Sequence, residues 1–422
     1  MARKTTTRQP QFNLQPLEAR QLLSASPSGL SPAQVANAYG YNQVSFSVSG
    51  QTVKADGSGQ TIAIVDAYDD PTIVNDLKVF DKAFSLSDNN AAGQFVLTKY
   101  MMNSRVKADA GWAQEISLDV EWAHALAPKA SILLVEAASS SVGDLMSAVD
   151  YARKQTGVVA VSMSWGQSEF RGETSYDSYF TTPSGHIGGS GIAGGVAFVT
   201  ASGDSGAGAE WPAVSPNVIG VGGTTLKTDS AGDYLGETAW NLSGGGYSIY
   251  EPTQVSSPDV AFNANPNTGF SVYDSTKASG VVGWQTVGGT SDGAPAWAAL
   301  LALADQARAA GGLGSLDSRT ALQGIYAAPA TNFHDIVSGN NGYYSAGPGY
   351  DLVTGRGSPV ANLLAADLAT YTSTSTASGK PASTGSTGGT GTGVGGGGGG
   401  GTGQGWWPYG GYGYGRRGRF GW

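Results

Sequence analysis

The chain contains 422 residues, enough for one large domain with flanking segments. Only 13% of its residues are charged, well under the ~25% of an average globular protein, and the net charge is −9. This composition offers no basic patch for nucleic acid over the core, and the lack of cysteine excludes disulfides and thiolate metal sites. No apolar run approaches the ~18–20 residues that a membrane span requires.

The N-terminal segment, residues 1–29, indicates export or attachment to a cell surface. Its positive start fits an export leader, although the long apolar stretch of a signal peptide is missing. Residues 17–25 read Leu-Glu-Ala-Arg-Gln-Leu-Leu-Ser-Ala and resemble the LEPR-XLL-type motif of some bacterial surface proteins. The alternative is a short amphipathic helix with no targeting function. We expect a secreted or surface-associated bacterial protein.

Residues 30–370 show an alternation of apolar strands and helical stretches. This alternation predicts a single α/β domain, with a parallel sheet covered by helices on both faces. The expected strands are 60–66, 131–136, 157–164, 195–202 and 217–222, and the expected helices are 73–85, 112–126, 142–155 and 293–309.

A pair of carboxylates lies in the helix predicted over 112–126. Glu115 and Asp119 are four residues apart, so both project from one helix face. The pair borders an apolar stripe, a setting that raises a carboxyl pKa and favours a shared proton. The alternative is a solvated face. We expect His124, near the end of this helix, to be a packed residue, with Ser/His/Asp chemistry as the alternative.

Asp204 lies in a glycine-rich turn after the strand predicted over 195–202. In open parallel α/β sheets, reactive groups collect in the loops at the carboxyl ends of the strands. A carboxyl that stays protonated there can donate a hydrogen bond to a developing oxyanion. The alternative is an aspartate that only caps the turn.

Ser291 lies between the Gly-rich turn 288–290 and the helix predicted over 293–309. A serine at a helix N-terminus is typical of an exposed nucleophile, because free N–H groups and the positive end of the helix dipole face its oxygen. Such a serine normally needs an imidazole base, yet none of the three histidines lies in a His-Gly-x-His type of motif. The carboxylate pair is the candidate base. A helix N-cap without catalytic role is the alternative.

These features together resemble the sedolisins, the serine-carboxyl peptidases. The motifs that carry the resemblance are Gly-Thr-Ser-x-x-x-Pro at 289–295, the Glu/Asp pair, and Ser-Gly-Asp-Ser-Gly at 202–206. Further agreeing segments, in the expected order over about residues 31–370, are 162–166, 237–241, 243–246 and 258–269. The resemblance implies a subtilisin-like α/β fold and an endopeptidase that works at acidic pH through an acyl-enzyme on protein or peptide substrates.

The resemblance also implies roles for individual residues. Ser291 would be the nucleophile, Glu115 the general base, Asp119 its orienting partner and Asp204 the oxyanion donor. Asp66, at the end of the strand 60–66, would be a further acid hydrogen-bonded toward Glu115 or Asp119, with turn capping as the alternative. Two segments are expected to pair with an extended substrate; their residues are Ser162, Trp165, Gly166, Ser243, Gly244 and Gly245.

A metal site is expected near the end of the domain. Two carboxylates and the carbonyls of tight glycine turns form an oxygen-only shell, which suits Ca²⁺ and not zinc, although the spacing alone more often marks turn residues. The resemblance implies one structural Ca²⁺, held by the carboxylates of Asp335 and Asp351 and the carbonyls of Ile336, Gly347 and Gly349.

One departure from the sedolisins concerns their large N-terminal prodomain, because the mature-like sequence starts here at about residue 30. We therefore expect unaided folding, a separate prodomain or chaperone, or loss of activity. The alternative function is a catalytically inactive surface module that binds peptides or cell-wall material. The Gly/Ser/Thr-rich tail 371–422, with its aromatic end, is expected to be disordered and is a candidate for contact with the cell wall.

Overall fold

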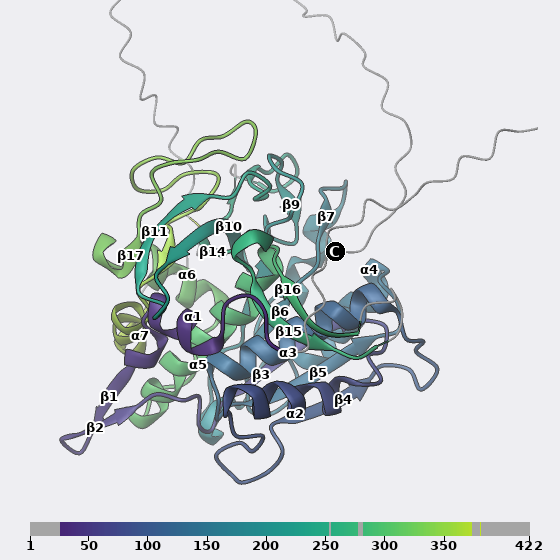
Figure 1. Ribbon diagram of the computed structural model, residues 1–422. Helices are drawn as coiled ribbons and strands as arrows, with labels where there is room; N and C mark the ends of the chain where they lie inside the picture. The colour runs from purple at the N-terminus through teal and green to yellow at the C-terminus, as the bar shows by residue number, and fades with distance from the viewer. Residues whose placement is uncertain (1–25, 253–254, 277–281, 374–379, 381–422) are drawn as a thin grey trace, which may run out of the picture.

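The computed structural model describes residues 26–252, 255–276, 282–373 and 380 (Figure 1). Residues 1–25 of the predicted N-terminal segment and most of the C-terminal tail therefore lie outside the described residues. The tail contributes residues 371–373 and Lys380, which is buried with its Nζ 3.0 Å from Asp259 Oδ2. No helix within the described ranges is long and apolar enough to cross a membrane.

The centre of the domain is an eight-stranded, mostly parallel sheet (Figure 1). Its strand order is β11-β10-β8-β6-β3-β5-β4, and β14 also pairs with β10. Every pairing is parallel except β10 with β11. The strands are β3 (Thr61–Ala67), β4 (Leu97–Met101), β5 (Ser131–Ala137), β6 (Val158–Met163), β8 (Ala197–Ala201), β10 (Ile219–Thr228), β11 (Tyr234–Ala239) and β14 (Val260–Asn263).

Helices cover both faces of the sheet, because its central strands are apolar on both sides. On one face α3 and α5 pack against Ile62 and Ile64 of β3, while on the other face α4 packs against Ala63 and Val65. The helices are α1 (Pro32–Ala38), α2 (Ile73–Phe84), α3 (Ala110–Leu126), α4 (Val142–Ala152), α5 (Gly293–Ala310), α6 (Ser318–Ala327) and α7 (Ala361–Thr370). This is the subtilisin-like α/β architecture that the sequence predicts.

Short antiparallel pairs extend from this body. Two of them are hairpins of four or five residues per strand, β1 (Ser45–Val48) with β2 (Gln51–Lys54) and β15 (Phe270–Asp274) with β16 (Gly283–Val287). The remaining pairs have two residues per strand: β7 (Gln167–Ser168) with β9 (Glu210–Trp211), β12 (Gly246–Tyr247) with β13 (Ser256–Ser257), and β17 (Phe333–His334) with β18 (Ser358–Pro359).

The five predicted strands and four predicted helices are confirmed, with ends that differ by a few residues. The sequence analysis did not predict β4, β11 and β14 in the sheet, or the helices α1, α6 and α7. The carboxyl ends of the parallel strands form one edge of the sheet. Asp66 lies at the end of β3, Ser164 just after β6 and Asp204 shortly after β8, so the fold brings these side chains to the same edge.

Candidate active site

Ser291 lies in a single 3-10 turn, Thr290–Asp292, immediately before the 18-residue helix α5. The turn is closed by the Asp292 N–H, which donates to the Gly289 carbonyl at 3.1 Å. A Cβ on Gly293 would lie 2.5 Å from Val221 Cγ1, so a glycine lets the helix start close against the sheet. The serine is thereby held at the N-terminus of a helix whose first turn is almost completely buried.

Glu115 on α3 is the group that faces the Ser291 hydroxyl. Burial raises the pKa of Glu115 to about 8, hydrogen bonding from Ser291 opposes the rise, and the negative charge of Asp204 adds to it. The Glu115 side chain is partly exposed, unlike the carboxyls behind it. Glu115 Oε1 itself is buried, however, and Ser291 is only 5% exposed, so the nucleophile and the carboxylate meet inside the protein.

Asp119, one turn further along α3, lies fully buried behind Glu115. Ser164 donates a hydrogen bond of 2.8 Å to Asp119 Oδ1 and lies 3.4 Å from the Ser291 carbonyl oxygen. Burial, followed by the charges of Asp66 and Glu115, raises the pKa of Asp119 well above its ordinary value. The charge of Glu115 therefore acts on Asp119, although no hydrogen bond joins the two carboxyls.

Two more buried carboxyls, Asp66 and Asp292, complete the cluster. Neither makes a hydrogen bond to another described residue. Burial raises the pKa of Asp66, with Glu115 and Glu136 adding to the shift, and burial with the charges of Glu115 and Asp204 raises that of Asp292. The charge of Asp66 thus interacts with those of Glu115 and Asp119. The direct hydrogen bond that the sequence analysis predicted for Asp66 is absent among the described residues.

Asp204 approaches Ser291 from the turn after β8. Its Oδ1 accepts hydrogen bonds from the N–H and the hydroxyl of Thr290, both at 2.8 Å. Its Oδ2 lies against Gly289, where an added Cβ would come within 2.5 Å of that oxygen. Burial raises the pKa of Asp204 to about 6, against the effect of the Thr290 hydrogen bonds. Oδ1 anchors the carboxyl and leaves Oδ2 available for a proton directed at the site.

None of the three histidines contacts this cluster. His124 Nε2 lies 3.2 Å from Asp81 Oδ1, and it is nine residues from Glu115 on α3, about 13 Å along the helix axis. His186 contacts the Val158 carbonyl, and His334 stacks on Tyr234. The expectation that His124 is a packed residue agrees with its complete burial.

Residues 108–343 match the profile of the subtilase family, Peptidase S8. The chain belongs to the subtilase family. Among curated relatives, this subtilase is 39% identical to sedolisin of Pseudomonas sp. (strain 101) over 174 residues, which cover 35% of this chain and 28% of that protein. It is 31% identical to kumamolisin of Bacillus sp. (strain MN-32) over 386 residues, which cover 80% of this chain and 63% of the relative. The chain thus spans less than two thirds of these relatives.

Comparison with solved structures agrees with this family assignment. The structure of Pseudomonas sedolisin, a serine-carboxyl proteinase complexed with two molecules of pseudo-iodotyrostatin, superposes with a TM-score of 0.65 at 26% identity, over 81% of this chain and 98% of that one. A lanthipeptide protease, at 14% identity and a TM-score of 0.52 over 79% and 92% of the two chains, shares the fold alone. These relatives support the resemblance of this subtilase to the sedolisins.

The segments expected to bind substrate differ in what they leave accessible. Ser162 is fully buried inside β6, and the Trp165 indole donates to the Val65 carbonyl at 2.7 Å. The Gly244 N–H donates to Gly203 O at 2.6 Å and the Gly245 N–H to Gly208 O at 3.0 Å. The Ser243 hydroxyl in turn accepts the Gly223 N–H. In this subtilase, Gly244 and Gly245 are therefore already paired with the loop that carries Asp204, whereas the Ser243 hydroxyl pairs with Gly223 of β10 and the Val353 carbonyl.

Sequence reasoning missed three polar residues near the nucleophile: Ser164, Asp292 and Glu210. A Cβ on Gly203 would lie 2.7 Å from Glu210 Oε2, so the Glu210 carboxyl lies against the residue before Asp204. Burial, with the charge of Asp204, raises the pKa of Glu210 to about 8. An acidic residue directly after the nucleophile was the one available signal for Asp292; Ser164 and Glu210 reach the site only through the fold.

The loops predicted to hold calcium converge on Gly347–Gly349. The Gly349 N–H donates to both Asp335 oxygens, at 3.1 and 3.0 Å, and the Gly347 N–H donates to Asp351 Oδ2 at 3.1 Å. Among the described residues, no hydrogen bond reaches the carbonyl oxygens of Ile336, Gly347 or Gly349. These oxygen donors are of the kind that a hard cation prefers, and both Asp351 oxygens also accept hydrogen bonds from Val353 and Thr354.

Proposed function

We propose that this protein is an acid-acting serine-carboxyl endopeptidase, in which Ser291 is the nucleophile and Glu115 its general base. The observation that carries the proposal is the Ser291 hydroxyl facing Glu115, with Asp119 behind it and no histidine in contact. A serine hydroxyl needs a base within hydrogen-bond reach, and Glu115 is the group in that position. The relatives named sedolisin and kumamolisin support this reading.

In the proposed reaction, Ser291 Oγ attacks the carbonyl carbon of the scissile bond and passes its proton to Glu115. Asp119, held by Ser164, shares the charge and proton of Glu115 and fixes its orientation. Asp204, protonated at Oδ2, donates a hydrogen bond to the developing oxyanion. Glu115 then returns its proton to the leaving amine, and water hydrolyses the acyl-enzyme by the same steps in reverse order.

This scheme requires an ionised Glu115 beside a protonated Asp204. Part of the raised pKa of Glu115 comes from the negative charge of Asp204, and that part disappears when Asp204 carries its proton. The Ser291 hydrogen bond already lowers the pKa of Glu115 to the value of about 8, and burial accounts for most of the remaining rise. Because this value lies above the value of about 6 for Asp204, the scheme requires the pKa of Glu115 to fall below that of Asp204 in the complex with substrate. A shared proton in the Glu115/Asp119 pair and a retained proton on Asp204 coexist below neutrality, so we expect activity to peak in acid.

The function is tested by proteolysis of denatured protein from pH 3 to pH 8, with Ser291→Ala as the control. Cleavage that peaks in acid and is abolished by Ser291→Ala supports the proposal. No cleavage at any pH by correctly folded protein would favour the alternative, a catalytically inactive module that binds peptides or cell-wall material.

We further propose one structural Ca²⁺, held by the Asp335 and Asp351 carboxylates and the carbonyls of Ile336, Gly347 and Gly349. The ion would neutralise the two carboxylates and tie the Gly347–Gly349 loop to the body of the domain. The unpaired carbonyls and converging carboxylates support this assignment.

We also propose that the protein is exported and acts outside the cell or at its surface. The N-terminal segment supports export, and an acid-acting peptidase needs an acidic compartment. Cell fractionation tests the proposal; protein found only in the cytoplasm would contradict it. Whether a separate prodomain or chaperone assists folding is tested by refolding the purified chain alone.

A further inference from the structure

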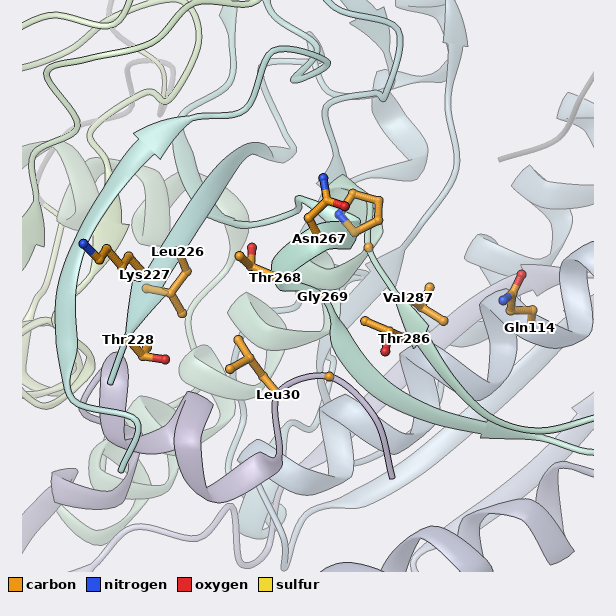
Figure 2. A pocket seen from close by; sticks show the side chains of 13 residues that line it. Leu30, Gln114, Leu226, Lys227, Thr228, Asn267, Thr268, Gly269, Thr286 and Val287 are labelled. Atoms are coloured by element: carbon orange, nitrogen blue, oxygen red, sulfur yellow. The ribbon is translucent and has the colours of Figure 1, made fainter. Parts of the chain in front are cut away.

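A groove of about 890 Å³ runs beside the hairpin of β15 and β16, with Gln114 and Lys227 at its two ends (Figure 2). Leu30, Thr286 and Val287 lie between these ends (Figure 2). The lining is a mixture of short apolar, hydroxyl and amide side chains, and Lys227 is its one charged member.

The lining of the groove includes sequence neighbours of the candidate active site. Gln114, at one end, directly precedes Glu115 on α3. Gly288, in the wall, directly precedes Gly289, which touches Asp204. On the opposite wall, a Cβ on Gly223 of β10 would lie 3.2 Å from Thr290 Cγ2, and β10 then continues into the lining. Gln114, Gly288 and β10 thus place part of the lining next to residues of the candidate active site.

The chemistry of the proposed reaction indicates which part of a substrate lies on the side of this groove. The base that accepts the Ser291 proton must return it to the leaving nitrogen, so that nitrogen lies beside Glu115. The chain beyond it must leave along the α3 side. The segments of Gly166 and Ser243 lie instead around Gly203, on the Asp204 side. The acyl part and the leaving part of a substrate are thus assigned to different sides of Ser291.

We propose that this groove binds the residues of a peptide substrate that follow the scissile bond, and that Lys227 selects a negative charge at its far end. The inference rests on the proposed peptidase function. Lys227 lies four positions after Gly223 on β10, and Gly223 lies beside Thr290; four steps of about 3.3 Å give about 13 Å. An extended peptide has the same rise, so Lys227 faces approximately the fourth residue after the scissile bond.

The chemistry of Lys227 fits this role. Its side chain is exposed and makes no ion pair with any described acidic residue. The exposed Asn267 side chain, also in the lining, makes no hydrogen bond to a described residue and can meet a peptide backbone. The favoured substrates are therefore extended peptides with Asp, Glu or a terminal carboxylate at that position.

The inference is tested with amidated peptides that share one cleavage site and differ only at the fourth residue after it: Asp, Asn or Lys. We expect kcat/KM at pH 5 to fall in that order, by twofold to fivefold between Asp and Asn, as for an exposed ion pair. Lys227→Met should equalise the three peptides and Lys227→Glu should reverse their order. Lys154→Met, in the turn after α4 at the other face of the sheet, removes an exposed lysine far from the groove and should leave the order unchanged.

Two negative results have different meanings. An unchanged preference in both Lys227 variants would overturn the groove assignment and leave the peptidase proposal standing. Failure of the unaltered protein to cleave any peptide would overturn the proposed function, and the groove assignment with it.

Discussion

Asp204→Asn keeps a hydrogen-bond donor at the oxyanion position but removes the group that titrates. The two side chains are nearly isosteric. The Thr290 N–H and hydroxyl bind Asp204 Oδ1, and an asparagine Oδ1 can accept both bonds. The amide nitrogen then takes the place of Oδ2 beside Gly289, the position from which a proton must be donated. The variant keeps a donor at every pH, whereas the carboxyl donates only while it is protonated.

The expected magnitude follows from the pKa of Asp204, which burial raises to about 6. The protonated fraction is about one half at pH 6 and about one hundredth at pH 8, so the unaltered protein should lose roughly 50-fold of its kcat between these pH values. Asp204→Asn should be less active at pH 5 but should not show this alkaline decline. Asp204→Ala, which removes the donor, should lose about 10²–10³ in kcat at pH 5, where the carboxyl is protonated, and less as the pH rises.

The assay is the pH dependence of kcat for a short peptide substrate, with folding at each pH checked by circular dichroism. The acid limb of the profile belongs to the Glu115/Asp119 pair and should be the same in both proteins. An alkaline limb that is unchanged in Asp204→Asn would refute the assignment of Asp204 as a proton-bearing oxyanion donor.

Three further predictions concern packing, stability and metal. Gly289→Ala places a Cβ 2.5 Å from Asp204 Oδ2 and should lower kcat at least tenfold with little change in melting temperature; full activity would argue against the contact. Burial raises the pKa of Asp305 to about 8, so the folded state binds its proton more tightly than the unfolded state. Stability should therefore be greatest below about pH 4 and fall as pH rises toward 8, by several kcal/mol at about 1.4 kcal/mol per pKa unit. Asp305→Asn, which keeps an acceptor for the Leu316 N–H, should flatten the melting temperature measured against pH; an unchanged slope would contradict this. Chelation of bound calcium should lower the melting temperature by a few degrees, because the ion binds only the folded state; equal melting of calcium-loaded and chelated protein would count against the site.

Much of the fold follows from local patterns in the sequence. The apolar runs of β3 and β6 and the long helix α5 are buried on nearly all sides, and such segments are recognisable without tertiary information. The strand β4 was missed because it lies at the edge of the sheet and leaves Tyr100 and Met101 40% exposed, so it lacks an apolar run. The helices α1, α6 and α7 are short, and tertiary packing determines them more than their own periodicity.

The candidate site was predictable where the motif itself carries the geometry. The spacing of Glu115 and Asp119 places both on one helix face, and the Gly-rich turn before Ser291 predicts its place at a helix start. Ser164 was not predictable, because it meets Asp119 only through the pairing of β6 with the rest of the sheet. The internal pairing of Gly244 and Gly245 with distant glycines is likewise a long-range feature that no local pattern indicates.

The most direct measurement of the central claim is the pH dependence of acyl-enzyme formation, followed by acid quench and mass spectrometry of the peptide that contains Ser291. We predict an adduct on Ser291 that forms fastest in acid, is absent in Ser291→Ala, is lost in Glu115→Gln, and persists with the same pH dependence in His124→Ala. An adduct that forms fastest near pH 8, survives Glu115→Gln and disappears in His124→Ala would contradict a carboxylate base and establish a histidine-dependent hydrolase.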